Sequence, residues 1–93
     1  MKTLHLTLKK KWFDMICSGE KKEEYRELKT YWYSRLVSEP KFREFDIVEF
    51  RNGYGKAAPV LRVEFKGTSI GYGKKEWGGG DRNYYIIKLG EII

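Results

Sequence analysis

The sequence has few of the residues that mark secreted, zinc-binding or membrane proteins. Among 93 residues it has one cysteine, one histidine and two prolines. A single cysteine cannot form an internal disulfide, and one histidine with one cysteine makes no recognisable zinc site. No apolar run reaches about 18 residues, so no membrane-spanning helix is expected, and the first residues, MKTLHLTLKKK, lack the pattern of a signal peptide. We therefore predict a cytoplasmic protein that uses no metal or other cofactor.

Basic and aromatic residues, in contrast, are abundant. Lysine and arginine number 19 against 13 aspartates and glutamates, which gives a net charge of +6, and 16% of the residues are aromatic. The charge favours an anionic partner such as nucleic acid, a nucleotide or an anionic surface, although it could also serve solubility alone. The length suits a single compact domain over residues 1–93, with the aromatic residues filling its core.

Several segments have patterns typical of strands: 4–8, 22–27, 48–51, 59–66 and 82–93. The third and fourth are joined through the turn signal Asn52-Gly53, which predicts an antiparallel pair. We expect an α+β fold that is mainly β, a small curled sheet or barrel with two short helices. A parallel α/β sheet is disfavoured because the second half of the chain has no crossover helices.

The first predicted helix is WFDMIC, residues 12–17. Phe13, Ile16 and Cys17 fall at helical spacing and would form its buried side. Cys17 is therefore interpreted as a small core residue rather than a reactive thiol. Gly19 supplies the left-handed backbone that lets the chain turn sharply after the helix.

The second predicted helix starts at Thr30, which can cap it, and ends before Pro40. Trp32 and Arg35 lie outside its apolar stripe. They could stack on a base and contact phosphate, or the tryptophan could pack against the core under the stem of the arginine.

The segment CSGEKKEEYRE, residues 17–27, is unusually dense in ionisable residues. In an extended strand Glu24 and Arg26 share one face, and Lys21 lies in the turn before them. Two interpretations stay open: a polar edge strand whose charges pair in water, or a cluster that binds a ligand. The second interpretation requires that these three side chains converge on one partly enclosed hollow.

The segment 71–81, GYGKKEWGGGD, has five of the ten glycines. It forms no phosphate loop, because no GKS or GKT follows the glycines and no helix pattern begins there. Tyr72 and Trp77 flank two lysines and could stack on a nucleobase while the lysines contact phosphate. Alternatively, Trp77 anchors this loop to the body of the domain.

From Gly19 to Arg26 the chain resembles the signature of the ASCH family, in the PUA-like superfamily: glycine, any residue, lysine, any two residues, glutamate, any residue, arginine. The motif reads GEKKEEYR here, with Lys21 and Glu24 at its central fixed positions. The alternating first strand, the helix that ends in SG and the aromatic-rich closing strand extend the resemblance over the chain. It implies a PUA-like β-barrel with a polar cleft beside the second strand, and RNA or a nucleotide as the ligand.

The same resemblance implies an alternative function. Some bacterial ASCH proteins of this size are amidohydrolases of acylated cytidine nucleosides, with a lysine, a threonine nucleophile and a distant glutamate. Lys21 matches the lysine, but Glu24 stands where the threonine is expected. A hydrolase, or a ribonuclease, would use Lys21 and Glu24 as its catalytic pair, with Glu64 or Glu76 as a remote acid.

Three hypotheses for function follow. The first is binding of RNA or a nucleotide by the motif residues Gly19, Lys21, Glu24 and Arg26 together with the aromatic residues Tyr25, Trp32, Tyr72 and Trp77. The second is the hydrolase. The third is a regulatory or phage-related interaction domain in which the polar cleft is vestigial.

Overall fold

The computed structural model describes the whole chain, Met1–Ile93. In chain order the elements are β1 (Thr3–Leu8), α1 (Lys10–Cys17), β2 (Glu23–Arg26), α2 (Thr30–Leu36), β3 (Val37–Ser38), β4 (Lys41–Phe42), β5 (Ile47–Asn52), β6 (Val60–Tyr72), the 3-10 helix η1 (Lys75–Trp77) and β7 (Asn83–Ile92). The result is a mixed α/β domain, with one five-stranded sheet and one two-stranded sheet.

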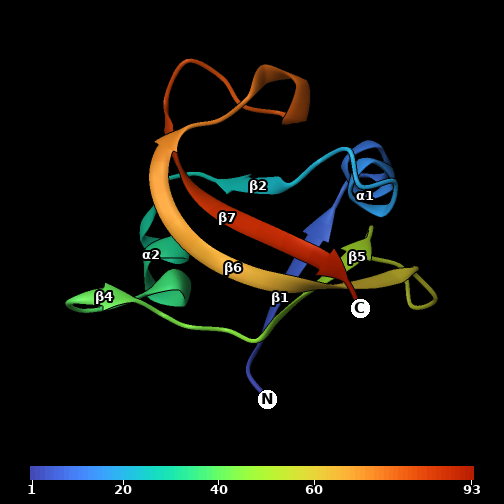
Figure 1. Cartoon of the computed structure of the whole chain (residues 1–93), viewed down its shortest axis with the longest axis horizontal. Coiled ribbons are helices and arrows are strands. Elements are labelled where there is room, and N and C mark those ends of the chain that lie inside the picture. Colours follow the sequence, from blue (N-terminus) through green and yellow to red (C-terminus); the bar gives the residue numbers. More distant parts are fainter.

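The two edges of the large sheet stay apart, so the predicted PUA-like barrel is wrong. The strand order is β1-β5-β6-β7-β2, which leaves β1 and β2 as edges. β6 curves strongly around the domain (Figure 1), with register shifts on either side of Phe65. Between the edges lies a side-chain contact: Arg26 Nη2 donates to the Thr7 carbonyl at 3.2 Å. Alternation specifies the faces of strands, whereas closure depends on strand pairing and stagger that local patterns do not contain.

Pairing within this sheet is mostly antiparallel. β5 and β6 form the predicted antiparallel pair, and β7 pairs antiparallel with both β6 and β2. β1 and β5, however, are parallel, with Thr3 opposite Ile47 and Leu8 opposite Asn52. Parallel strands need a long connection that returns the chain to the same end of the sheet, and the segment from α1 through β4, in the first half of the chain, provides it.

Both predicted helices are present, and they lie at the two ends of β2 (Figure 1). Phe13 and Ile16 of α1 are buried, and Gly19 has the predicted left-handed conformation with φ of 84°. Cys17 is exposed, so its prediction as a core residue is wrong. Cys17 is the last residue of α1, where the chain already turns away from the sheet, and Trp12 packs against the core from this helix instead.

α2 begins at Thr30, but the residue at its N-cap is Lys29, which makes no capping side-chain bond. The predicted cap at Thr30 is therefore wrong by one position. Leu36 at the end of α2 is fully buried and holds the helix against the sheet. No helix of the structure has the length and apolarity needed to cross a membrane.

The core is formed by side chains from both helices and four strands of the large sheet. Leucines of β1 alternate inward as predicted, and Phe50 and Val48 of β5 are completely buried. The cluster comprises Leu4, Leu6, Leu8, Phe13, Ile16, Leu36, Val48, Phe50, Val63, Tyr85, Ile87 and Leu89. The domain is thus held together by one continuous apolar interior, with β2 and its charged residues along one border.

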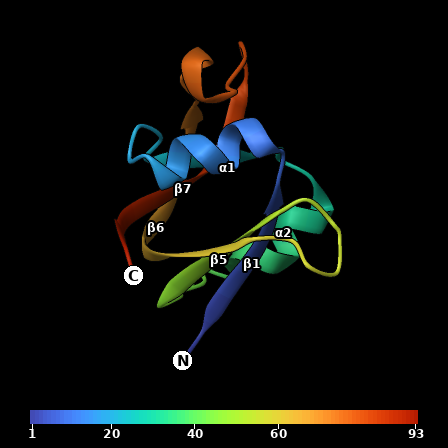
Figure 2. The same cartoon turned by 90° about the vertical axis from the view of Figure 1, so that its right-hand side faces the viewer.

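The glycine-rich segment between β6 and β7 is tightly folded. It lies at the top of Figures 1 and 2, next to α1. The backbones of Gly73 and Gly79 touch, and the amide of Gly79 donates to the Lys74 carbonyl at 2.8 Å. Gly78 has φ of 98° and lies against the ring of Trp12. Both positions favour glycine. A Cβ on Gly79 would overlap the backbone of Gly73, and Gly78 has a left-handed backbone conformation that other residues rarely adopt.

Replacing Gly79 with alanine is expected to lower the free energy of unfolding by about 1–3 kcal/mol, the usual cost of overpacking. A Cβ at this position would lie 2.4 Å from the carbonyl carbon of Gly73, and backbone cannot yield as a side-chain end does. Urea unfolding measures the change. The control is Gly55→Ala, where a Cβ meets nothing within 4 Å. Equal effects of the two substitutions would contradict the close packing of Gly79 on Gly73.

Candidate functional site

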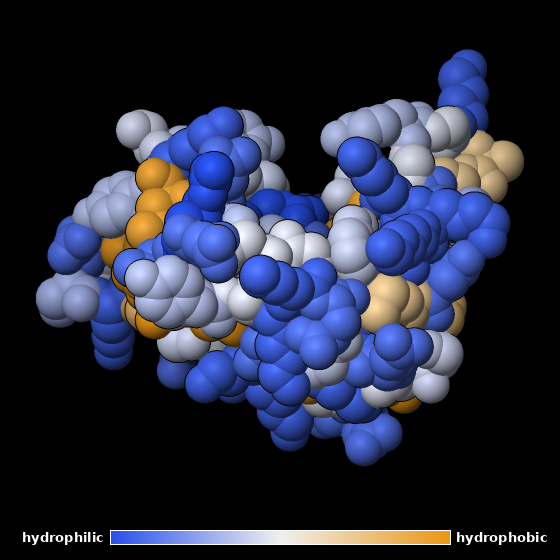
Figure 3. All heavy atoms as spheres, turned by 90° about the horizontal axis from the view of Figure 1, so that it is seen from above, coloured by the Kyte–Doolittle hydropathy of each residue, from blue (hydrophilic) through white to orange (hydrophobic).

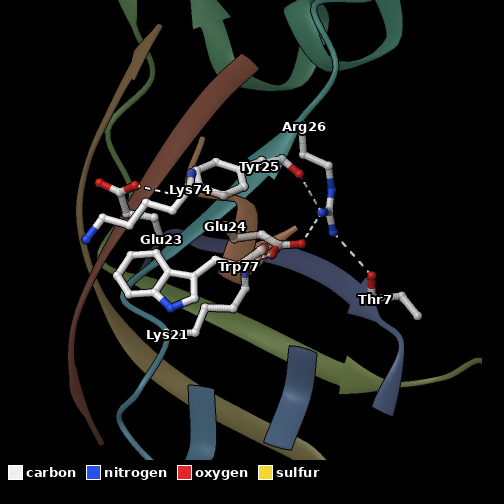
Figure 4. A network of polar contacts seen from close by, with 8 residues as sticks. All are labelled: Thr7, Lys21, Glu23, Glu24, Tyr25, Arg26, Lys74 and Trp77. Atoms are coloured by element: carbon white, nitrogen blue, oxygen red, sulfur yellow. Dashed lines mark hydrogen bonds and ion pairs between the residues drawn. The ribbon is translucent and has the colours of Figure 1, made fainter. Parts of the chain in front are cut away.

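Lys21, Glu24 and Arg26 contact one another (Figure 4), but the three side chains do not share one hollow, because Lys21 borders no cavity that the other two reach. The Nζ atom of Lys21 lies 3.0 Å from Oε1 of Glu24, and Nη1 of Arg26 donates to Oε2 of the same carboxylate. Glu24 is buried between the two cations. Each carboxylate oxygen therefore has a positively charged partner, as a buried charge requires.

Lys21 is the least accessible of the three residues. It is 1% exposed, and its Nζ donates to the Trp77 carbonyl at 2.7 Å. The ammonium also lies 5.2 Å from the ring centroid of Trp12 and 4.9 Å from that of Tyr25. Burial lowers the pKa of Lys21 below its ordinary value, and the nearby Glu24 carboxylate opposes this shift. Lys21 therefore lies beneath the glycine-rich loop and not in an open cleft.

Tyr25 connects β2 with that loop. Its hydroxyl donates to Oε1 of Glu23 at 2.8 Å and accepts from the backbone amide of Lys74 at 2.9 Å (Figure 4). Its ring also packs on Tyr84, with 5.7 Å between centroids. Burial of the phenol raises the pKa of Tyr25 to about 12, and Glu23 contributes in the same direction while the Lys74 amide opposes it.

This shift predicts how Tyr25 contributes to stability at alkaline pH. The phenol ionises near pH 10 when unfolded but keeps its proton to about pH 12 when folded. Its contribution is therefore complete below pH 10 and is lost as the pH rises to 12, by at most about 2–3 kcal/mol. Urea unfolding of the wild type and Tyr25→Phe should show their difference in stability shrinking over this range. A difference that stays constant would contradict the shift.

Arg26 occupies the gap between the two edges of the sheet. Besides Glu24, its Nη1 donates to its neighbour's carbonyl, Tyr25 O, at 2.9 Å, and its Nη2 donates to the Thr7 carbonyl. The guanidinium lies 5.1 Å from the ring centroid of Trp32 on α2. The side chain is still 15% exposed. It is therefore fixed by polar contacts on one side and remains accessible on the other.

A cavity of about 730 Å³ opens beside this accessible part of Arg26, and we name it the main cleft. Its walls come from β1, from the end of β2, from α2, from the start of β7 and from the two loops that follow β5 and precede β7. Aromatic and basic side chains dominate the lining, including Arg26, Tyr31, Trp32, Tyr54, Arg82 and Tyr84. The surface seen from above is mostly hydrophilic and is notched between two raised parts (Figure 3).

A second, smaller cavity of about 210 Å³, which we name the inner cavity, also borders Arg26. Both cavities are bordered by Thr7, Tyr25, Arg26 and Gly78, and the inner cavity also reaches Glu24 and Trp77. Lys21 borders neither of them. A molecule in these cavities could therefore contact Arg26 and Glu24 but not Lys21.

The rim of the main cleft contains two further groups of charges. His5 Nδ1 lies 3.0 Å from Oε2 of Glu49, and the other oxygen of this carboxylate, Oε1, accepts from Arg62 Nε at 3.1 Å. The hydrogen bond from Arg62 lowers the pKa of Glu49 below its ordinary value, and His5 acts in the same direction. On the opposite side Arg82 lies 3.8 Å from the exposed carboxylate of Glu27. The Arg82–Glu27 pair is exposed on both sides and contributes little to stability, whereas Glu49 is only 17% exposed between its two partners.

The structure distributes the other predicted site residues differently. Trp32 lies in the main cleft, packed under Arg26, and the carbonyl of Trp77 anchors the loop to Lys21. Gly19 forms the turn after α1, and Tyr72 is exposed on β6 outside both cavities. Sequence analysis missed several lining residues from distant segments, namely His5, Tyr31, Tyr54, Arg82 and Tyr84. Tyr54, next to the Asn-Gly turn, offered the best signal, because a large aromatic residue at an exposed turn has no packing role.

Fold and site together define a small α/β domain with a basic, aromatic cleft between the edges of an open sheet. No group of three or more histidine, cysteine, aspartate or glutamate side chains comes together in a way that could hold a metal ion. Comparisons with protein-family models, curated proteins and solved structures found no match to the chain. Membership of the ASCH family therefore stays a prediction from the motif.

Proposed function

We propose that this domain binds single-stranded RNA or a nucleotide in the main cleft. The observation that carries the proposal is the lining of this cavity of about 730 Å³, where exposed aromatic rings stand beside two arginines. Such a combination suits unpaired bases, which stack on aromatic side chains while cations neutralise the phosphates. A cleft of this volume is within the range that small-molecule and cofactor sites occupy.

Two tyrosines are placed to stack on bases. Tyr31 on α2 is 56% exposed and Tyr54 is 91% exposed, although both border the cleft. The ring of Trp32 has less free surface, because the Tyr31 ring packs on it at a right angle with 4.8 Å between centroids and Arg26 lies over the Trp32 ring. Arg35 lies 4.3 Å from the centroid of the Tyr31 ring, but Tyr31 stays more exposed than Trp32. We therefore assign stacking to Tyr31 and Tyr54, with Trp32 as the support beneath them. The net charge of +6 adds a long-range attraction for a polyanion.

The test is the affinity for a fluorescent single-stranded RNA of about six nucleotides, a length within the site sizes of single-strand-binding modules. Tyr31→Ala should weaken binding by about 5- to 150-fold, which corresponds to about 1–3 kcal/mol for one stacked base. Tyr72→Ala is the matched control, since Tyr72 is exposed but lies outside the cavities. Affinity should also fall with added salt. Absence of RNA binding, or equal losses for both variants, would contradict the proposal.

A hydrolase that uses Lys21 and Glu24 is the second candidate function. One observation favours it: Glu24 reaches the inner cavity, next to a lysine whose pKa is lowered by burial. The lysine itself borders neither cavity, and both oxygens of Glu24 are already engaged. Of the two proposed remote acids, Glu64 accepts from the amide of Glu91 instead, far along the sheet.

Turnover distinguishes this candidate from binding alone. A hydrolase should convert an acylated nucleoside or a short RNA to products, and Glu24→Gln should abolish that conversion while circular dichroism shows a folded protein. If the wild type converts none of these substrates, hydrolysis of acylated nucleosides and short RNA is excluded. The proposal that the domain binds RNA or a nucleotide would still stand.

A further inference from the structure

We infer that the main cleft contains a phosphate subsite formed by the free edge of Arg26, and that Lys21 positions this arginine without contacting the ligand. The inference rests on the proposed function and adds a division of roles to it. Arg26 would recognise a phosphate monoester or diester of the bound nucleotide. Lys21 and Glu24 would act only through the orientation that they give to the guanidinium.

The hydrogen bonds of Arg26 leave one edge of its guanidinium unused. An arginine side chain has five N–H donors. Both donors of Nη1 are taken, by Glu24 and by the Tyr25 carbonyl, and one donor of Nη2 is taken by the Thr7 carbonyl. The Nε–H and the second Nη2–H remain without partners in the structure. These two donors belong to adjacent nitrogens, which is the arrangement that binds two oxygens of a phosphate in parallel.

The orientation of this edge is fixed before any ligand binds. Contacts to Glu24 and to two backbone carbonyls hold the guanidinium from one side, and the ring of Trp32 lies 5.1 Å from it. Arg26 borders both cavities, so the space next to it can accept a ligand group. A pre-oriented donor pair loses less conformational entropy on binding than a free side chain does. The subsite therefore favours a planar, two-point contact with phosphate.

Lys21 cannot take this role itself. Its ammonium is enclosed by Glu24, the Trp77 carbonyl and two aromatic rings, and it is 1% exposed. Its charge instead offsets that of the carboxylate to which Arg26 is bound. Through Trp77 it also holds the glycine-rich loop, whose Gly78 borders both cavities. Loss of this ammonium would leave Glu24 with one partner and release one wall of the cleft, so Arg26 would lose its fixed orientation.

The experiment compares nucleosides with their 5′-monophosphates. For each pair the ratio of the two Kd values gives the gain in affinity due to phosphate, which we name the phosphate gain. We expect a gain of about 10-fold or more for the wild type, the value of hydrogen bonds to a charged group. Arg26→Ala should reduce the gain to about 1-fold. Lys21→Met should reduce it by at least about 3-fold, and Lys22→Met, which removes an exposed neighbouring lysine, should leave it unchanged.

A double-mutant cycle separates positioning from a general structural effect. If Lys21 acts through Arg26, then Lys21→Met should change the phosphate gain in the wild type but not in the Arg26→Ala background. A merely structural role would weaken nucleoside and nucleotide equally and leave the gain unchanged. Should Lys21→Met fail to fold, Lys21→Gln, which retains two N–H donors, replaces it. In the wild type itself, the Arg26 Nε–H resonance should shift with the 5′-monophosphate and not with the nucleoside.

The possible results are distinct. If the wild type binds neither nucleotides nor RNA, both the proposed function and this inference fail. If it binds them but Arg26→Ala keeps the phosphate gain, the subsite is elsewhere and the function stands. If Lys21→Met reduces the gain equally in both backgrounds, Lys21 contacts the phosphate independently and its positioning role is overturned.

Discussion

Replacing Glu24 with alanine is expected to lower the free energy of unfolding by about 3–5 kcal/mol, the cost of removing one partner from a buried ion pair. The substitution would leave the ammonium of Lys21, which is 1% exposed, without its carboxylate. The Nη1 donor of Arg26 would lose its partner as well. Urea unfolding followed by tryptophan fluorescence measures the effect, and it should be the largest of any charged residue in the chain.

Glu27→Ala is the matched control for this substitution. Glu27 follows the same strand and also lies near two cations, Lys29 at 3.4 Å and Arg82 at 3.8 Å. Its carboxylate is half exposed, so we expect its loss to cost less than about 1 kcal/mol. A cost for Glu24→Ala as small as that for Glu27→Ala would show that water reaches the network and that its charges are not enclosed.

Leu36→Ala is expected to have the second-largest effect, a loss of about 2–5 kcal/mol in the free energy of unfolding. Leu36 is fully buried in the core and attaches α2 to the sheet. Because α2 also provides Tyr31 and Trp32 to the main cleft, the proposed RNA affinity should fall along with stability. Thermal unfolding and RNA titration of the same variant measure both effects.

Leu28→Ala provides the comparison. Leu28 lies just before α2 and is exposed, so the same change of side chain removes little buried surface. Its stability should change by less than about 0.5 kcal/mol. If Leu36→Ala destabilises the protein but leaves RNA binding intact, then α2 does not form a wall of the ligand site.

Local patterns were sufficient to predict most of the elements and the central cluster. The alternating leucines of β1, the helix before Gly19 and the antiparallel β5–β6 pair follow from periodicity and turn residues over short stretches. The mutual contacts of Lys21, Glu24 and Arg26 also follow from local sequence, because these residues lie at most five positions apart, whereas a hollow shared by all three does not occur. Geometry within one turn and one short strand is largely determined by the sequence that forms it.

The errors at Cys17 and Thr30 are local, whereas the larger ones concern contacts between distant segments. The open sheet depends on which strands meet at the edges, and the burial of Lys21 depends on a carbonyl 56 positions away. Sequence analysis placed Lys21 only in the turn before the second predicted strand, because the local sequence does not show that the carbonyl of Trp77 lies over it. The walls of the main cleft likewise come from β1, α2 and two loops, and no single stretch indicates that Tyr31, Tyr54 and Arg82 face one cavity.

The most direct test of the central claim is nuclear magnetic resonance of the labelled protein during titration with single-stranded RNA. The account predicts that the largest chemical-shift changes occur at residues bordering the main cleft, including the Arg26 side chain, Tyr31 and Gly78. Residues 41–46, which border two other surface cavities, should change little. Shifts confined to residues 41–46, or no shifts at all, would contradict the claim that this cleft is the ligand site.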